Sequence, residues 1–228
     1  MTVAIAVIAK APVAHRVKTR LCPPLAPAAA ADAAAAMLLD VLDNCAGAGR
    51  EVLCVYAGDP RALRGCVGEE VRILPQGPGS LAGRLRRAQA ALFAEGHRAV
   101  VLMSGDSPTV EPALMDEVVG AIRRRDADVV VGPAYDGGYT LLATQAPTPT
   151  LFDHVEMSTN RVLDQTLLQA RRAGLTSRLV DARHDIDTIG DYRSALARGE
   201  LESAPRTRVA LGGALPATNE ATAGAGEG

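Results

Sequence analysis

The sequence contains no tryptophan, and aromatic residues make up only 3% of its 228 residues. A folded core must therefore be built from Val, Leu, Ile and Ala, which dominate a hydrophobic content of 48%. Charged residues account for 22%, a balance typical of a globular protein and not of a disordered chain. A chain of this length accommodates one sizeable domain and is short for two.

Paired metal-binding cysteines are also missing. Cys22, Cys45, Cys54 and Cys66 form no C-x-x-C pair and have no histidine at zinc spacing. We interpret them as free thiols in a reducing compartment, and we expect a cytoplasmic protein. The opening MTVAIAVIAKAPV has no basic segment before its apolar run and cannot span a bilayer, so it predicts a first strand.

An excess of positive charge is absent as well. The net charge is −2, so no overall positive field attracts the chain to nucleic acid or to an anionic membrane, and we expect neither partner. Local basic clusters can still bind a small anion. The sequence does not fix the oligomeric state, and a homodimer is one arrangement that it leaves open.

Strand-like and helix-like patterns alternate along the chain. Strands are expected at residues 3–8, 51–56, 71–74, 99–103, 128–131, 139–143 and 176–180. Helices are expected at residues 28–44, 80–95, 112–124, 160–173 and 190–198. This order predicts an α/β fold with a mostly parallel central sheet and helices on both faces, with one irregularity at the adjacent strands around Asp136.

The domain is expected to span residues 1–203. From residue 204 to residue 228 the chain reads APRTRVALGGALPATNEATAGAGEG, rich in Ala, Gly, Thr and Glu. Such a segment buries little apolar surface for each residue that it orders. We therefore expect residues 204–228 to form a disordered tail.

Ligands of open α/β sheets bind at the carboxyl ends of the strands, so polar residues just after the predicted strands are candidates for a site. The first strand leads into a basic loop in which Lys10, Lys18 and Arg20 suit a polyphosphate. A solvated charged loop is the alternative. The segment is not a P-loop, because the glycines and the G-K-[ST] ending are missing.

Two aspartates follow later strands. Asp106 lies in SGDSP, where it either opens a loop or holds a metal ion. Asp136 lies in GPAYDGGYTLLA, where Gly137 and Gly138 permit positive φ angles and a close backbone approach to a ligand. An ordinary Asp-Gly hairpin turn is the alternative, and the segment on its own favours it.

The segment HDIDTIGDY carries two more carboxylates. Asp185 and Asp187 project to the same side if the segment is extended. Thr188 and Asp191 have the spacing of an N-cap and its N3 partner, and this capping role leaves the aspartate pair unexplained. Carboxylates on separate loops, with a basic loop opposite, are the requirements of a Mg²⁺- or Mn²⁺-phosphate site. The histidines form no pattern of a nucleophilic catalytic site.

Taken in order, IAKAPVAHRVKTRL, GDSP, GPAYDGGYTLL, STNRVLDQTL and HDIDTIGDY resemble a family of bacterial GT-A-type, glycosyltransferase-like proteins, DUF2064. The likeness runs from about residue 3 to residue 192. The KTRL loop and the late D-x-D are more distantly similar to the 2-phospholactate guanylyltransferases of deazaflavin-cofactor biosynthesis. The resemblance implies a nucleotide-diphospho-sugar transferase fold, a Rossmann-type sandwich with the nucleotide near the first strand and a divalent cation at the aspartates.

The resemblance also implies roles for single residues. Lys10, Lys18 and Arg20 are expected to meet phosphates. The metal ligands are expected to be Asp106, Asp185 and Asp187, and the catalytic residues Asp106, Asp136 and Lys18. The acceptor or sugar side is expected to include Asp136, Gly137, Gly138, Ser158 and Thr159.

Three positions depart from the family pattern. Ala14-His15 replaces a usual Pro-Gly, Ser80 replaces an aspartate, and Met157 replaces a tryptophan that would offer a stacking surface. These departures bear on the identity of the substrate more than on the fold.

We therefore expect a metal-dependent transferase acting on a nucleotide-activated substrate. The first hypothesis is glycosyl transfer from a nucleoside diphosphate sugar to a small-molecule acceptor, in which Lys18 and Arg20 stabilise the departing diphosphate and Asp136 orients or deprotonates the acceptor. One alternative is a nucleotidylyltransferase, guanylyltransferase-like, that joins a nucleoside triphosphate to a phosphorylated small molecule. Another is a non-catalytic nucleotide-binding protein.

Overall fold

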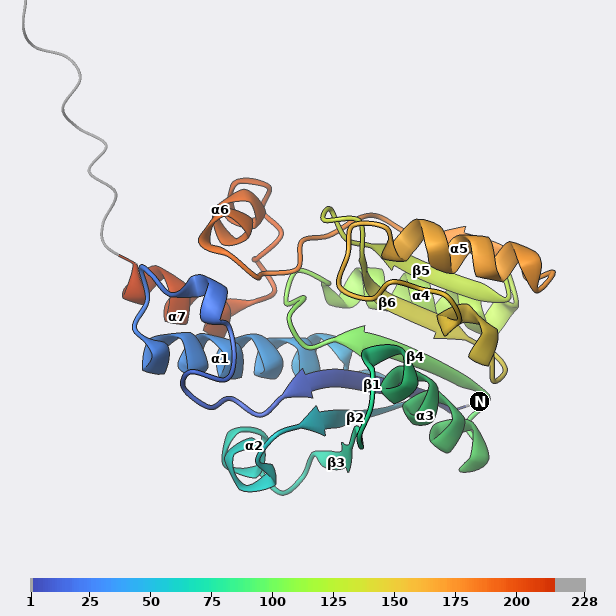
Figure 1. The fold of residues 1–228 in the computed structure, drawn as a ribbon, viewed down its shortest axis with the longest axis horizontal. Helices are drawn as coiled ribbons and strands as arrows, with labels where there is room; N and C mark the ends of the chain where they lie inside the picture. The colour runs from blue at the N-terminus through green and yellow to red at the C-terminus, as the bar shows by residue number, and fades with distance from the viewer. Residues whose placement is uncertain (1, 216–228) are drawn as a thin grey trace, which may run out of the picture.

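The computed structural model describes residues 2–215, in which strands and helices alternate as predicted (Figure 1). The strands are β1 (Val3–Lys10), β2 (Arg50–Ala57), β3 (Arg72–Pro75), β4 (Ala99–Ser104), β5 (Val129–Pro133), β6 (Tyr139–Thr144) and β7 (Ser177–Leu179). The α-helices are α1 (Pro27–Cys45), α2 (Pro60–Val67), α3 (Leu81–Ala94), α4 (Pro112–Arg124), α5 (Val162–Arg172), α6 (Ile189–Ala197) and α7 (Pro205–Ala214). Two 3-10 turns, η1 (Thr19–Leu21) and η2 (Pro149–Phe152), lie in the connections.

These strands form one sheet in the order β3-β2-β1-β4-β6-β5-β7. Neighbouring strands are parallel except where β6 pairs antiparallel with β4 and with β5. The predicted mostly parallel sheet is confirmed, and β6 is the irregularity expected around Asp136. As a result, β1 and β4 end at the same edge of the sheet at which β6 begins.

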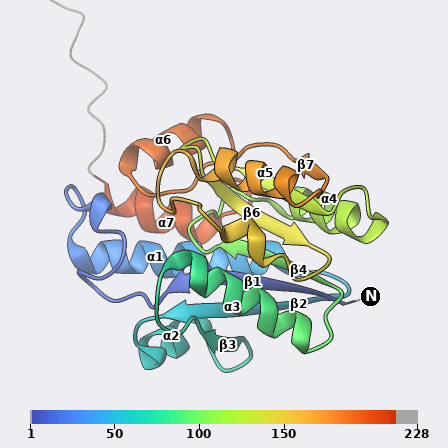
Figure 2. The same cartoon turned by 45° about the vertical axis from the view of Figure 1, so that its right-hand side comes forward.

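Helices cover both faces of the sheet (Figure 2). The cluster that contains Val3, Ile5 and Val7 packs against α1, α2 and α4 on one face. On the other face, Ala4 and Ala6 belong to a cluster with α3, α5 and η2. Because side chains on both sides of β1 are buried, the strand reads in the sequence as a continuous apolar run.

The folded domain extends further than the sequence predicted. Residues 205–214 form α7, which packs against α1, so the boundary at residue 203 is wrong. The buried Asp40 on α1 accepts hydrogen bonds from the backbone N–H groups of Arg206 (3.3 Å) and Thr207 (2.7 Å). These N–H groups at the start of α7 have no partner inside their own helix, so Asp40 supplies the missing acceptors. The composition of residues 204–228 could not reveal this distant partner. The expected disorder of residues 216–228 lies outside the described residues.

A second helix that the sequence did not predict is α2. Asp59 accepts a hydrogen bond from the backbone N–H of Arg61 (2.9 Å), and Pro60 occupies the first helical position.

The four cysteines are free thiols, as predicted. Between residues 2 and 215, no helix combines the length and the apolar character needed to cross a membrane.

Candidate active site

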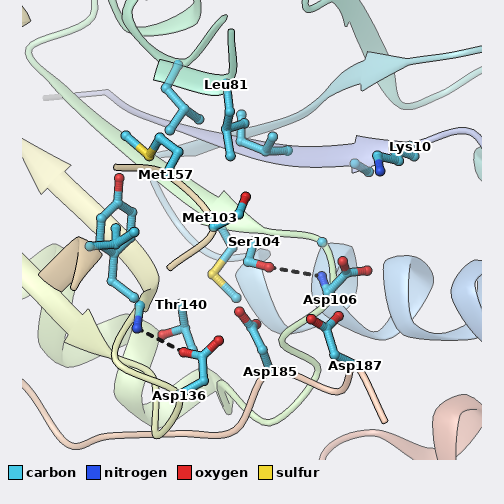
Figure 3. Close-up of a pocket in the computed structure, with 18 of the residues that line it drawn as sticks. Lys10, Leu81, Met103, Ser104, Asp106, Asp136, Thr140, Met157, Asp185 and Asp187 are labelled. Carbon is cyan, nitrogen blue, oxygen red and sulfur yellow. Dashed lines mark hydrogen bonds between the residues drawn. The ribbon is translucent and has the colours of Figure 1, made fainter. Parts of the chain in front are cut away.

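A cleft of about 710 Å³ opens at the edge where β1 and β4 end and β6 begins. The basic loop after β1, the turn after β4, the β5–β6 turn and the segment before α6 all contribute to its wall (Figure 3). Ten of the eleven residues that the sequence singled out line it: Lys10, Lys18, Arg20, Asp106, Asp136, Gly138, Ser158, Thr159, Asp185 and Asp187.

Gly137 is the exception. Its φ is +88°, and a Cβ atom there would lie 2.2 Å from the carbonyl oxygen of Asn160. Gly137 therefore lets the β5–β6 turn pack against the loop before α5, and it is not among the residues that line the cleft, so its contact with a substrate stays a prediction. Its neighbour Gly138 does line the cleft.

The turn around Asp106 is built by a close approach to β1. The backbone N–H of Gly105 donates to the carbonyl of Ile8 at 2.9 Å, and a Cβ atom on Gly105 would lie 3.0 Å from that same oxygen. The Asp106 backbone N–H donates to Ser104 Oγ at 3.2 Å, which closes the turn (Figure 3). Half of the Asp106 side chain remains exposed to the cleft.

Lys18 crosses to the carboxylates. Its ammonium lies 3.0 Å from Asp106 Oδ1 and 2.9 Å from Asp187 Oδ1, and it donates to the carbonyl of Ile186 at 2.7 Å. Only 5% of the side chain is exposed. Burial alone would lower the pKa of Lys18, but the charges of Asp106 and Asp187 outweigh it and raise the pKa. Lys18 is therefore a protonated counter-ion of the acidic cluster.

Asp185 and Asp187 face the cleft together, as predicted, while Ile186 between them points into the core. Burial raises the pKa of Asp185 to about 7, against a hydrogen bond that its carboxylate accepts from Ser107 Oγ. At Asp187 the effect of burial is outweighed by Lys18, whose charge and hydrogen bond hold the pKa below its usual value. The predicted capping box of Thr188 and Asp191 starts α6 and fixes this segment.

Within residues 2–215, no group of three acidic, histidine or cysteine side chains is placed to hold a metal ion as it stands. The ammonium of Lys18 forms ion pairs with carboxylate oxygens of Asp106 and Asp187, which a metal ion would otherwise contact. The donor set itself still suits a divalent cation, because three hard carboxylates face a single ammonium. The raised pKa of Asp185 reflects this excess of negative charge as well as burial.

The remaining cations lie at the cleft rim. Arg20 is exposed and contacts Asp187 Oδ2 at 3.2 Å, and Lys10, the last residue of β1, is also exposed. His15, where the family pattern has glycine, has a φ of +64°, so the loop keeps the left-handed backbone that glycine would accept without strain.

Asp136 has the turn role that the sequence allowed, and its place in the cleft leaves a role toward a ligand as a prediction. It closes the β5–β6 hairpin by accepting the backbone N–H of Gly138 at 2.8 Å, and its side chain also lines the cleft (Figure 3). Ser80, at the second departure, is the N-cap of α3 and accepts the Gly83 N–H at 3.2 Å. An aspartate would make the same cap, so this substitution preserves the helix start.

Sequence reasoning missed several lining residues. Gln76 directly follows β3, and Arg84 lies on α3; both line the cleft. Because Gln76 stands at the end of a strand, the strand-end argument could have found it. Tyr139 also lines the cleft, and burial raises the pKa of its hydroxyl, which has no hydrogen-bond partner within the described chain. An unpartnered buried hydroxyl is a group that a ligand can satisfy.

Known structures share this architecture. A crystal structure from Desulfovibrio desulfuricans G20, of a protein named for the nucleotide-diphospho-sugar transferases, has a TM-score of 0.84 and 27% identity, with 93% of this chain and 95% of that chain covered. A Mycobacterium tuberculosis H37Rv protein in complex with manganese has the same fold, with a TM-score of 0.54, 19% identity and coverage of 86% and 98%. The chain therefore has the fold of the nucleotide-diphospho-sugar transferases.

The family follows from the sequence match. The family described as "Uncharacterized protein conserved in bacteria (DUF2064)" matches residues 38–159. A 3-phospho-D-glycerate guanylyltransferase of Phenylobacterium zucineum (strain HLK1) is 34% identical over 171 residues, 72% of this chain and 76% of the relative. The chain belongs to the DUF2064 family, as its motifs predicted.

These relatives also bear on the enzyme class. They confirm the expectation of a transferase. Of the two reactions considered, nucleotidylyl transfer has the better support, because a relative that is 34% identical is a guanylyltransferase. The first hypothesis, glycosyl transfer, gains no comparable support.

Proposed function

We propose that this protein is a nucleotidylyltransferase that joins a nucleoside monophosphate unit to a phosphorylated small molecule. The observation that carries the proposal is the contact of Lys18 with Asp106 and Asp187, which puts an ammonium that suits phosphate and carboxylates that suit a divalent cation in one cleft. The guanylyltransferase relative supports the same reaction.

In this reaction an oxygen of the acceptor phosphate attacks the α-phosphorus of a nucleoside triphosphate. The bond from the α-phosphorus to the oxygen that bridges to the β-phosphate breaks, and pyrophosphate leaves with the electron pair. The acceptor phosphate is already anionic, so no general base has to remove a proton from it. Asp136 therefore serves to position the acceptor side of the cleft and not to deprotonate the nucleophile.

Asp106, Asp185 and Asp187 are the residues that would hold a Mg²⁺ or Mn²⁺ ion, which when bound supplies charge neutralisation at the phosphates. A metal ion held by these oxygens would compete with Lys18 for Asp106 and Asp187, while the hydrogen bond from Lys18 to the carbonyl of Ile186 does not involve them. Lys18 then lies within the same cleft to bind phosphate oxygens, with Arg20 and Lys10 at the rim. Ser107 keeps Asp185 in place through its hydrogen bond.

The acceptor side is formed by the turn before β6 and the loop before α5. Gly138, Ser158 and Thr159 line it, next to Asp136. The φ of Ser158 is +65°, so this loop holds a non-glycine residue in the left-handed region at the cleft. These groups are the ones that we expect to contact the phosphorylated acceptor.

The test is a pyrophosphate-release assay with each of the common nucleoside triphosphates, a divalent cation and phosphorylated hydroxy acids such as 3-phosphoglycerate. We expect release with at least one pair, and a loss of about 100-fold or more in Asp106→Asn. Asp32→Asn, an exposed aspartate on α1, is the matched control and should keep full activity. Consumption of a nucleoside diphosphate sugar without any pyrophosphate release would refute the proposal and restore glycosyl transfer.

A further inference from the structure

We propose that Gln76 and Arg84 read the nucleobase, and that they select the lactam edge of guanine or uracil. A lactam edge presents a ring N–H beside an exocyclic carbonyl oxygen. This inference rests on the proposed function, which puts a nucleoside triphosphate in the cleft. It concerns the identity of the base, which the phosphate-binding residues do not determine.

The cleft has a charged end and an apolar end. Figure 3 shows Leu81 and Met157 at the opposite end of the view from Asp106, Asp185 and Asp187. Leu81 and Leu85 on α3 line this apolar end together with Met157. Since the polyphosphate has to face the acidic cluster, its cation and Lys18, the base extends towards α3. Apolar walls with a few fixed polar groups are typical of a base-binding slot.

Gln76 is one of those fixed polar groups. Only 6% of the residue is exposed, and its side-chain Nε2 donates to the carbonyls of Ala9 (3.1 Å) and Val55 (3.0 Å). Both amide N–H groups are therefore used at the ends of β1 and β2. A flipped amide would place Oε1 against two carbonyl oxygens, so the orientation is determined. Oε1 is left as a hydrogen-bond acceptor.

Arg84 puts a donor beside that acceptor. Its Nη1 lies 3.5 Å from Gln76 Oε1, at the limit of a hydrogen bond, and its Nε donates to the carbonyl of Gly79 at 3.0 Å. A guanidinium has five N–H donors, and these contacts leave others available. The apolar end of the cleft thus carries one acceptor next to one charged donor.

This pair favours lactam bases for two reasons. Glutamine binds adenine through a bidentate contact that needs both its amide N–H and its oxygen, and the N–H groups of Gln76 are already used. An acceptor beside a donor also matches the amino group and ring nitrogen of adenine or cytosine, so the preference comes from the charged donor, because arginine binds most often to a carbonyl acceptor such as O6 of guanine. Oε1 of Gln76 then accepts a hydrogen bond from the ring N–H, and in guanine it can also accept one from the neighbouring amino group.

The test compares the binding of GTP, UTP, ATP and CTP in the presence of Mn²⁺ by isothermal titration calorimetry, with 1-methyl-GTP and 3-methyl-UTP as probes that lack the ring N–H. We expect GTP or UTP to bind about tenfold or more tightly than ATP and CTP. Methylation of the ring nitrogen should abolish that advantage. Equal binding of ATP or CTP, or no effect of methylation, would overturn the inference while leaving nucleotidylyl transfer intact.

Two variants separate base reading from support of the loop. Arg84→Met should bring the affinities for GTP, UTP, ATP and CTP to within about threefold of one another. Arg87→Met is the matched control, because Arg87 lies on the same helix, donates to the backbone carbonyls of Gln76 (3.2 Å) and Pro78, and does not line the cleft. If both variants change the base ranking equally, Arg84 acts only on the loop and the inference fails. If no triphosphate binds at all, the proposed function itself fails.

Discussion

The ammonium of Lys18 lies 2.9 Å from Asp187 Oδ1, which joins the loop after β1 to a segment 169 residues further along the chain. The same ammonium contacts Asp106. The basic loop therefore neutralises the carboxylates of the proposed metal site, and a metal ion and Lys18 compete for the same oxygens. The relationship predicts how the metal and this lysine affect stability together.

Replacement of Lys18 by methionine should make stability depend on a divalent cation. Without the ammonium, Asp106 and Asp187 repel each other, and we expect a loss of about 2 kcal/mol and a fall of about 6 °C in Tm. With millimolar Mn²⁺ the loss should be clearly smaller. Thermal unfolding measured in EDTA and in Mn²⁺ gives the loss of stability without and with the divalent cation. Lys10→Met, an exposed cation of the same cleft, is the control, and an equal loss for Lys18→Met in both buffers would contradict the prediction.

Gly137→Ala should destabilise the protein by about 2 kcal/mol, since a side chain at φ +88° is strained and its Cβ would overlap the carbonyl of Asn160. Gly138→Ala is the matched control. Its φ is not in the left-handed region, and the nearest atom to its Cβ is the Asp136 side-chain oxygen at 3.1 Å. Urea unfolding compares the two variants. A larger loss for Gly138→Ala would show that the packing against Asn160 is unimportant.

Asp40→Ala should loosen α7. The substitution leaves the backbone N–H and hydroxyl of Thr207 without their acceptor in a buried position, at a cost of about 2 kcal/mol. Hydrogen exchange of residues 205–214 should become faster than that of α1. Asp43→Ala removes the exposed partner of Arg206 and should change stability by less than about 0.5 kcal/mol. Unchanged exchange in Asp40→Ala would contradict the role of Asp40.

The pair formed by Glu111 and Arg183 should make stability fall in acid. Glu111 accepts two hydrogen bonds from Arg183, at 2.6 and 3.0 Å. Burial of Glu111 acts to raise its pKa, but Arg183 outweighs burial and holds the pKa below 4.5. A carboxyl whose pKa is lowered by folding stabilises the protein above its unfolded-state pKa, and this contribution is lost as the pH falls through the folded-state value.

Glu111→Gln should therefore be less stable than the natural protein at neutral pH and should lose less stability between about pH 5 and pH 3. Urea unfolding across that range measures the two slopes. Glu117→Gln, whose exposed carboxylate pairs with Arg178, is the control and should keep the natural slope. Parallel curves for Glu111→Gln and the natural protein would contradict the assignment.

Local patterns predicted most of the fold. The apolar run of β1, the proline that starts α4 at residue 112, and the capping box of Thr188 and Asp191 depend on neighbours in the sequence, and the structure has each of them. The strand-end rule then brought the predicted charged residues to one cleft. These features need no knowledge of distant contacts.

The features that sequence reasoning missed depend on distant partners. The acceptor role of Gln76 is fixed by carbonyls of β1 and β2, and the helix α7 depends on Asp40, far earlier in the chain. The contacts of Lys18 with Asp106 and Asp187 also join residues that lie far apart in the chain. Such pairings cannot be read from composition or spacing.

Ile186 connects the C-terminal helices to the acidic residues of the cleft. Its side chain belongs to the core cluster that includes Leu201 and Leu211, while the residues on either side of it are the aspartates of the cleft. A chain shortened before α7 would open one wall around Ile186 and let Asp185 and Asp187 shift against Lys18. The C-terminal helix α7 thus supports the position of the acidic cluster from a distance, although none of its residues lines the cleft.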